Sequence, residues 1–129
     1  LEFIEASNEA DTDFDAERVT GKLKSSFSLR AQEADTVSHY ISNAPFPLIS
    51  CGDFNDTPVS YTYRKMSSGL QDAFLERGFG IGATYAPFPF IRIDYQLFDE
   101  DKFTIVDFDR IKEGSSDHYG CVTRFIINK

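Results

Sequence analysis

Three short polar clusters in this sequence carry side chains that could catalyse a reaction. The first, Gly52-Asp53-Phe54-Asn55-Asp56, directly follows a hydrophobic run, so Asp53 and Asn55 should project together from a strand end. A carboxylate and an amide spaced in this way can face one cleft, the first as a proton acceptor and the second as an orienting donor. An Asx-rich turn that caps the strand explains the same residues, and this cluster alone favours the turn.

The second cluster is Asp94 within Arg92-Ile93-Asp94-Tyr95, in a segment that should form a strand. A carboxylate among apolar neighbours needs a partner, because an unpaired buried charge is costly. An ion pair with Arg92, or solvent on an exposed strand face, would meet that need. The functional alternative is a histidine whose tautomer the carboxylate fixes. The residues of this cluster by themselves favour neither interpretation.

The third cluster, Ser115-Ser116-Asp117-His118, precedes the last apolar run. It places a carboxylate suited to metal binding beside a titratable imidazole. A loop carboxylate next to a solvated histidine is the ordinary situation for an isolated pair of this kind. The other histidine, His39, lies among polar neighbours in a predicted helix, so we expect it at the surface.

Hydrophobic periodicity predicts the elements that position these clusters. Apolar residues at steps of three and four from Phe27 to Ile41 predict an amphipathic helix that Asn43-Ala44-Pro45 ends. Thr57-Pro58 predicts the start of a short helix that ends at Gly69. Four apolar or alternating runs predict strands, the first of them a buried central strand: 46–51, 91–97, 103–106 and 121–127. This order predicts a layered α/β (α+β) fold with much antiparallel pairing.

Length and composition set further bounds. With 129 residues we expect a single domain over 1–129, in which the acid-rich residues 1–24 form a polar loop or frayed segment. A net charge of −8 argues against a protein that coats nucleic acid. It does not argue against an enzyme for phosphate esters, because acidic residues can hold a divalent cation.

Neither a signal-peptide pattern nor an apolar run near the ~18 residues of a membrane span occurs in the sequence, which leaves the location of the protein open. Cys51 and Cys121 lie in apolar runs, where we expect buried thiols without a disulfide bond between them.

Taken together and in this order, Gly-Asp-Phe-Asn after a strand, Arg-Ile-Asp-Tyr in a strand and Ser-Asp-His before the last strand resemble the endonuclease/exonuclease/phosphatase superfamily. The resemblance runs from about Arg30 to Ile127. It implies a metal-dependent phosphoesterase and the C-terminal half of a four-layer, DNase I-like α/β sandwich. That half would have a mixed, mostly antiparallel sheet with helices on the outside.

The resemblance also implies a role for each matching residue. Asp53 would activate the attacking water, and Asn55 would steady the phosphate. His118 would contact a phosphoryl oxygen with Asp94 as its orienting partner, and Asp117 would lie on the metal side of the site. The expected cofactor of the complete enzyme is Mg²⁺ or Mn²⁺, which oxygen-rich sites suit.

The sequence departs from the family pattern at its N-terminal side. The Asn, the metal-binding Glu and the further His or Tyr of the family's N-terminal half have no counterpart here, and Ile4 stands where a histidine is expected. Gln96 replaces a more usual aliphatic residue. We therefore expect a C-terminal fragment that is inactive alone. The apolar surface that its missing half would cover should lead either to self-association or to a rearranged edge strand.

Two other functions stay open at this point. The chain could be a non-catalytic binding or assembly module that retains the fold, or a small acidic structural domain in which all three clusters are turns. For an enzyme, the phosphate ester could belong to a nucleic acid, a phospholipid or a sugar phosphate, and it could be a diester or a monoester.

Overall fold

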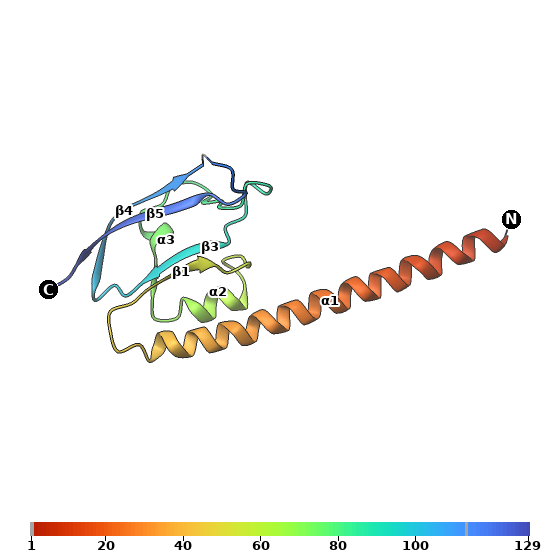
Figure 1. Cartoon of the computed structure of the whole chain (residues 1–129), viewed down its shortest axis with the longest axis horizontal. Coiled ribbons are helices and arrows are strands. Elements are labelled where there is room, and N and C mark those ends of the chain that lie inside the picture. Colours follow the sequence, from red (N-terminus) through yellow and green to blue (C-terminus); the bar gives the residue numbers. More distant parts are fainter. Residues whose placement is uncertain (1, 113) are drawn as a thin grey trace. The chain divides into compact units, whose positions relative to one another are not determined.

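The computed structural model describes residues 2–112 and 114–129, with side chains from residue 18 onward (Figure 1). Residue contacts divide the chain into two units, residues 1–33 and residues 34–129. The elements follow one another as α1 (Glu2–Ser42), β1 (Ile49–Asp53), α2 (Tyr61–Met66), β2 (Gln71–Asp72), α3 (Ala73–Arg77), β3 (Asp94–Phe98), β4 (Phe103–Ile111) and β5 (Gly120–Ile127). Along the described residues, no helix is both long enough and apolar enough to cross a bilayer.

Helix α1 corrects the expectation of a loop or frayed segment over residues 1–24, since it is helical from Glu2 onward. The sequence has no proline before Pro45 and a single glycine, Gly21, in this stretch, so nothing interrupts the helical hydrogen bonds. Acidic residues near a helix start also interact favourably with its dipole. The amphipathic helix predicted over Phe27–Ile41 is confirmed as the second half of α1, and His39 is exposed as expected.

The second unit contains two antiparallel sheets. A three-stranded sheet has the order β1-β3-β2, with Asp53 paired to Asp94 in the β1–β3 register. Strands β4 and β5 form a two-stranded sheet in which Ile111 pairs with Gly120. Together with the helices they confirm the predicted layered fold.

Strand β3 has a core on each of its faces. On one face, Tyr95 and Leu97 pack with Phe54, with Ala34 of α1 and with Met66 of α2. On the other face, Phe98 packs with Ala73 and Ile105, and partly buried phenylalanines of β4 and β5 surround them. The period-two alternation predicted for this strand is therefore confirmed at Tyr95 and Leu97. It turns Asp94 and Gln96 away from α1 and α2, to the face on which Phe98 packs.

Gln96 joins the two sheets on that second face. Its side-chain amide donates to the carbonyl of Cys121 in β5 (2.9 Å), and the Thr123 hydroxyl donates to its Oε1. The polar residue that stands in place of an aliphatic one thus has a structural role.

The prediction of a buried central strand over 46–51 is wrong. Strand β1 begins at Ile49, pairs only with β3 among the described strands and is mostly exposed, Cys51 included. The central strand is β3, because its buried side chains supply the cores on both faces. Both cysteines are free. The expectation of buried thiols is wrong for Cys51, which is exposed, and Cys121 is only partly buried.

Short elements also differ from the prediction. Helix α2 is capped by Ser60, whose hydroxyl accepts from the Tyr63 amide (3.1 Å), so it begins after the predicted Thr57-Pro58 start. Strand β2 and helix α3 are too short to leave a periodic signal and were not predicted. Strand β4 extends five residues beyond the predicted 103–106, to Ile111.

Candidate active site

The site begins where β1 and β3 end side by side. Asp53 is the last residue of β1 and Asp94 is the first of β3, and the two are register partners. The Phe54 amide donates to the carbonyl of Ile93 (2.8 Å), which extends the pairing past the strand end. Opposite residues of an antiparallel pair direct their side chains to the same face, so the two carboxylates face one side of the sheet.

A short backbone pairing brings His118 to these carboxylates. The Tyr119 amide donates to the carbonyl of Thr84 (2.7 Å), and the Ala86 amide donates to the carbonyl of Asp117 (2.8 Å). Thr84 is fully buried, and its hydroxyl accepts from the amides of Ile93 and Asp94 (3.0 and 3.1 Å). Thr84 therefore fixes the start of β3 and the histidine loop together, and no local pattern of residues predicts this link.

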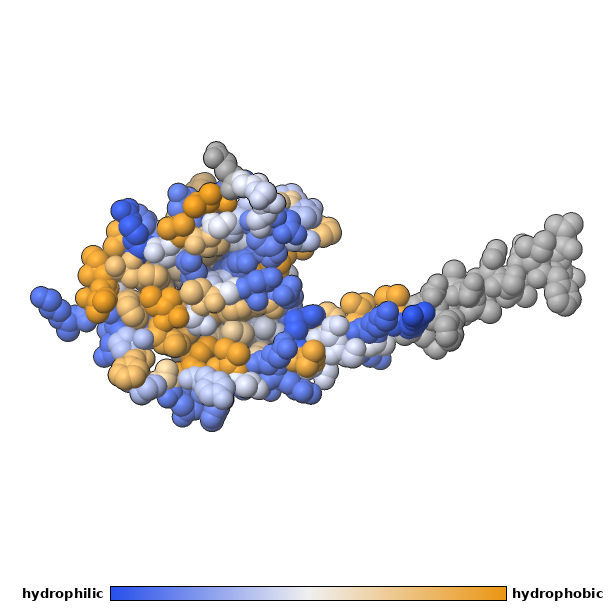
Figure 2. Space-filling view, viewed as in Figure 1, coloured by the Kyte–Doolittle hydropathy of each residue, from blue (hydrophilic) through white to orange (hydrophobic). Residues whose placement is uncertain are grey.

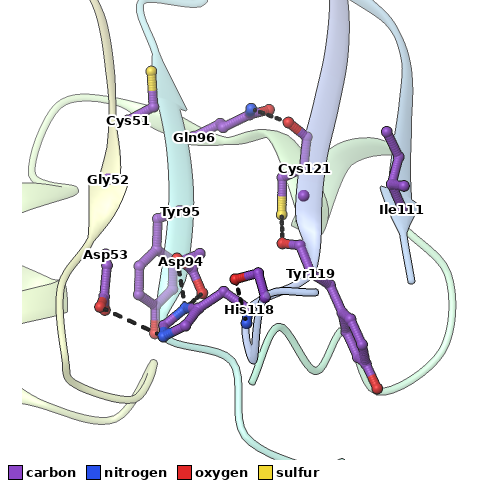
Figure 3. A pocket seen from close by; sticks show the side chains of 12 residues that line it. Cys51, Gly52, Asp53, Asp94, Tyr95, Gln96, Ile111, His118, Tyr119 and Cys121 are labelled. Atoms are coloured by element: carbon purple, nitrogen blue, oxygen red, sulfur yellow. Dashed lines mark hydrogen bonds and ion pairs between the residues drawn. The ribbon is translucent and has the colours of Figure 1, made fainter. Parts of the chain in front are cut away.

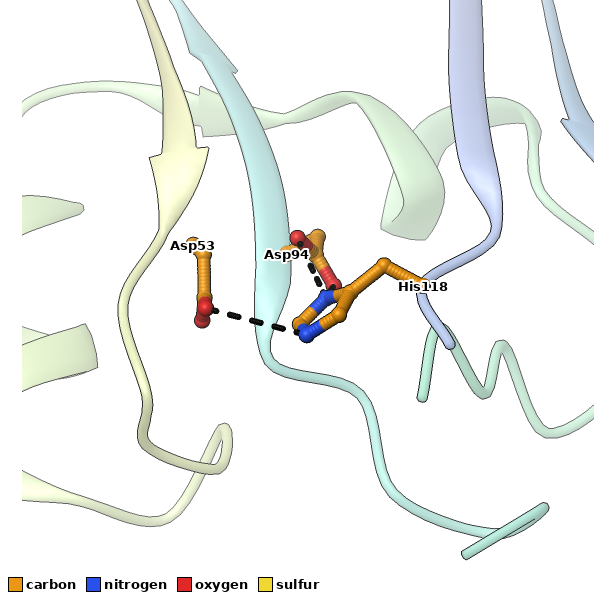
Figure 4. Close-up of side chains that lie close together, drawn as sticks. All are labelled: Asp53, Asp94 and His118. Carbon is orange, nitrogen blue, oxygen red and sulfur yellow. Dashed lines mark hydrogen bonds and ion pairs between the residues drawn. The ribbon is translucent and has the colours of Figure 1, made fainter. Parts of the chain in front are cut away.

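His118 lies between the two carboxylates (Figure 4). Its Nδ1 is 2.9 Å from Oδ2 of Asp94, and its Nε2 is 3.9 Å from Oδ2 of Asp53. The predicted pairing of Asp94 with a ring nitrogen of His118 is confirmed. The hydrogen bond to Asp94 raises the pKa of His118, and the negative charges of Asp94, Asp53 and Asp117 add to that effect against some desolvation. The imidazolium form is thus favoured.

An open groove of about 480 Å³ contains these three side chains, as Figure 3 shows, with Cys51 toward its opposite end. Its walls come from β1, β3, the end of β4, β5 and the loop before β5. The lining residues are Cys51, Gly52, Asp53, Asp94, Tyr95, Gln96, Ile111, Ser116, His118, Tyr119, Gly120 and Cys121.

Asn55 and Asp117 belong to the predicted site but do not line this groove. The backbone N–H of Asn55 donates to Oδ1 of Asp53 (2.7 Å), and the backbone of Asn55 is left-handed (φ 50°). The backbone of Asn55 therefore orients the Asp53 carboxylate. Asp117 is exposed and lies close enough to His118 for its charge to raise the pKa of that ring. Of the five residues expected in one cleft, Asp53, Asp94 and His118 share it.

The model of the Endonuclease/Exonuclease/phosphatase family matches residues 24–118, about three quarters of the chain and all three clusters. The chain belongs to this family. The family resemblance of the sequence is thereby confirmed.

Among solved structures, the mannosyl-6-phosphatase of Bacteroides thetaiotaomicron has a similar fold (TM-score 0.61, 19% identity). The match covers 75% of this chain and 45% of the phosphatase chain, so this family member spans less than half of that relative's length. No curated protein matches the sequence.

A buried ion pair between Arg92 and Asp72, near the candidate site, was not predicted from the sequence. Nη1 of Arg92 donates to Oδ2 of Asp72 (2.6 Å), and the two side chains are 5% and 3% exposed. The Tyr63 hydroxyl donates to the same carboxylate oxygen (2.8 Å). Arg92 therefore pairs with Asp72 and leaves Asp94 to His118, which decides between the alternatives left open for Asp94.

Tyr95 ties the Asp53 loop to this buried pair. Its hydroxyl lies 2.8 Å from the carbonyl oxygens of both Asp56 and Arg92, and its ring packs on Phe54 and Tyr63 (centroids 4.7 and 4.8 Å apart). Burial raises the pKa of Tyr95 far above its usual range, so the hydroxyl stays a donor. Tyr95 therefore holds the loop after β1 and the start of β3 together.

The donor atoms here fit a hard divalent cation in part. Asp53, Asp94 and His118 offer ligand atoms within 4.8 Å of one another. Asp94 already accepts from the ring, and the raised pKa of His118 favours the form that has no lone pair for a metal, so Asp53 is the ligand of this trio that remains. The exposed Asp117, whose charge acts on the His118 ring, is the other carboxylate of this region. Two carboxylates are fewer than an octahedral Mg²⁺ shell needs, and water or other protein groups would supply the rest.

Proposed function

We propose that this chain contributes to a phosphoesterase that hydrolyses a phosphodiester or phosphomonoester by in-line attack of water. The observation that carries the proposal is His118 held between Asp94 and Asp53 at the positions where the family motifs occur. A fixed proton donor opposite a fixed acceptor suits phosphoryl transfer, in which negative charge builds on the phosphoryl oxygens.

His118 would donate a hydrogen bond to a phosphoryl oxygen. Nδ1 is engaged by Asp94, so Nε2 is the atom that faces the groove. The 3.9 Å between Nε2 and Asp53 is too long for a hydrogen bond, so Nε2 is free to donate to a bound oxygen. Asp94 acts by keeping the ring protonated and correctly turned, which makes it a positioning residue.

Asp53 would accept a proton from the attacking water. The backbone N–H of Asn55 donates to Oδ1 of Asp53, and Oδ2 of Asp53 is the oxygen that faces the His118 ring. A carboxylate fixed at one oxygen and free at the other has the geometry of a general base. The side chain of Asn55 would steady the phosphate from the same loop.

A divalent cation, Mg²⁺ or Mn²⁺, would bind at Asp117 with help from Asp53. When bound, it would polarise the phosphoryl group and neutralise charge in the transition state. Because these two carboxylates are an incomplete shell, we propose that the remaining ligands come from a part of the domain outside this chain. The 45% coverage of the similar phosphatase is consistent with that view.

The same reasoning gives a proposal for the surface. Large apolar side chains are exposed on the two-stranded sheet, and the space-filling view shows apolar groups at the surface of this unit (Figure 2). Those on β4 and β5 are Val106, Ile111, Val122, Ile126 and Ile127. In the absence of a covering segment, we propose that copies of the chain self-associate there.

Hydrolysis assays test the proposal. A longer protein that contains this chain should hydrolyse bis-p-nitrophenyl phosphate or p-nitrophenyl phosphate with Mg²⁺ or Mn²⁺. Both esters are used because the proposal covers a diester and a monoester. His118→Asn should lower kcat by about 10²–10⁴-fold, while Lys65→Ala, an exposed control on α2, should not. An absence of hydrolysis in both assays, or full activity in His118→Asn, would contradict the proposal and favour a non-catalytic module.

A further inference from the structure

His118 is the first of four rings that contact one another in a row. Its ring centroid is 5.1 Å from that of Tyr85, which is 5.9 Å from Phe88, which in turn is 6.3 Å from Phe90. Tyr85 is half-buried, whereas Phe88 and Phe90 are 50% and 66% exposed. This ring row, Tyr85-Phe88-Phe90, leads from the candidate site out to solvent.

The loop that carries the ring row is fixed to the site by its backbone. The Phe88 amide donates to the carbonyl of Tyr85 (3.2 Å), and the Ile91 amide donates to the carbonyl of Phe88 (2.9 Å). Pro87 and Pro89 restrict φ on either side of Phe88. A stiff loop that keeps two phenylalanines in water, next to a tyrosine that contacts His118, is expected to bind something there, because isolated exposed rings need no such support.

We propose that the ring row is a stacking platform for a planar aromatic ring on the alcohol portion of a small phosphate ester, whose phosphate group binds at His118. The inference rests on the proposed function and narrows its substrate class. Continuity with the site argues for it, since Tyr85 contacts the histidine that would hold the phosphate.

The residues around the ring row favour one class of phosphate ester over others. A sugar would need polar side chains for its hydroxyls, but Ala86, Pro87 and Pro89, which separate the rings, offer none. A nucleic-acid polymer would meet a chain with a net charge of −8. A single aromatic ring attached to one phosphate group needs only stacking and one anion contact. Ring stacking of this kind increases affinity by about tenfold.

NMR titrations of the 129-residue chain test the platform without requiring turnover. The probes are inorganic phosphate, glycerol 3-phosphate and phenyl phosphate, followed at the His118 ring and at the Phe88 ring. We expect all three to shift His118, and phenyl phosphate alone to shift Phe88 and to bind about tenfold more tightly. Phe88→Ala and Phe88→Leu should remove that difference, and Phe88→Tyr should keep it.

Phe79 provides the matched control, because it is 93% exposed and has no part in the ring row. Phe79→Ala should leave the preference for phenyl phosphate intact. Equal affinity for phenyl phosphate and glycerol 3-phosphate, or equal effects of Phe88→Ala and Phe79→Ala, would overturn the inference. So would Phe88-dependent binding of glucose 6-phosphate that equals the binding of phenyl phosphate, or Phe88-dependent binding of phosphatidylcholine vesicles when no soluble phosphate ester is added.

The two proposals fail in different ways. If inorganic phosphate shifts His118 but no probe prefers the ring row, the platform is wrong and the phosphate site stands. If none of the three probes shifts His118, the proposed function itself is contradicted.

Discussion

Replacement of Asp72 by Asn should destabilise the fold far more than its small change in shape suggests. Asp72 accepts from Arg92, from the Tyr63 hydroxyl and, at Oδ1, from the Phe74 amide at the start of α3 (3.0 Å). An asparagine can still cap the helix and accept from Tyr63. What the substitution removes is the negative charge opposite a guanidinium that is 5% exposed.

The expected loss follows from the surroundings of Arg92. Its guanidinium lies over the rings of Tyr95, Phe74 and Tyr63 (4.7, 4.8 and 5.8 Å to the centroids), which partly compensate for the loss of a carboxylate. Breaking a buried pair by removing one partner costs about 3–5 kcal/mol. Domains of this size have a total stability of about 5–15 kcal/mol, so the variant should unfold at a much lower urea concentration.

Urea denaturation followed by circular dichroism measures this effect, with Asp107→Asn as the matched control. Asp107 makes the same kind of pair with Arg124, but both side chains are exposed, and we expect no resolved change there. The double variant Asp72→Asn/Arg92→Leu should be more stable than Asp72→Asn, because it keeps the cap of α3 and the Tyr63 contact but leaves no unpaired charge. Equal midpoints for Asp72→Asn and Asp107→Asn would refute the reasoning and would mean that Arg92 reaches solvent.

Three further predictions concern the site and the surface. Asp94→Asn should lower the pKa of His118, measured by NMR titration, because it removes the largest cause of the upward shift; an unchanged pKa would exclude the pairing. The folded-state pKa of His118 is raised, so the Asp94–His118 pair contributes its full stability below about pH 6.5 and loses it as the pH rises through the raised pKa. The urea midpoints of the parent and of Asp94→Asn should therefore differ more at pH 6 than at pH 9. The isolated chain should show no appreciable hydrolysis of bis-p-nitrophenyl phosphate with millimolar Mg²⁺ and should scatter light as more than a monomer; rapid turnover by a monomer would contradict the incomplete metal shell.

The site was largely predictable from the sequence because its chemistry lies at strand ends. Each cluster follows or precedes a run whose periodicity is clear, and a carboxylate in a strand must find a partner. The prediction that His118 is that partner came from the order of the motifs, and the structure confirms the contact. Asn55 and Asp117 do not line the groove that contains Asp53, Asp94 and His118, but Asn55 donates to Asp53 and the charge of Asp117 acts on His118, so their roles stay predictions.

The parts that were missed depend on contacts between distant residues or on patterns that periodicity does not record. Asp72 and Arg92 are twenty residues apart, and nothing local pairs them. Whether β1 is an edge strand or a central strand depends on which strands pair with it, and the hydrophobicity of its own residues does not reveal that. The acid-rich start of α1 lacks an apolar stripe, so its helical state follows only from the absence of breakers.

The central claim is that His118 holds a phosphoryl group, and phosphate affinity measured by isothermal titration calorimetry tests it most directly. The parent chain should bind inorganic phosphate, and His118→Asn should bind it about 10–100-fold more weakly, because a charge-assisted hydrogen bond is lost. His39→Asn, which changes the exposed histidine of α1, should bind phosphate as the parent does. Equal phosphate affinity in the parent and in His118→Asn would contradict the account.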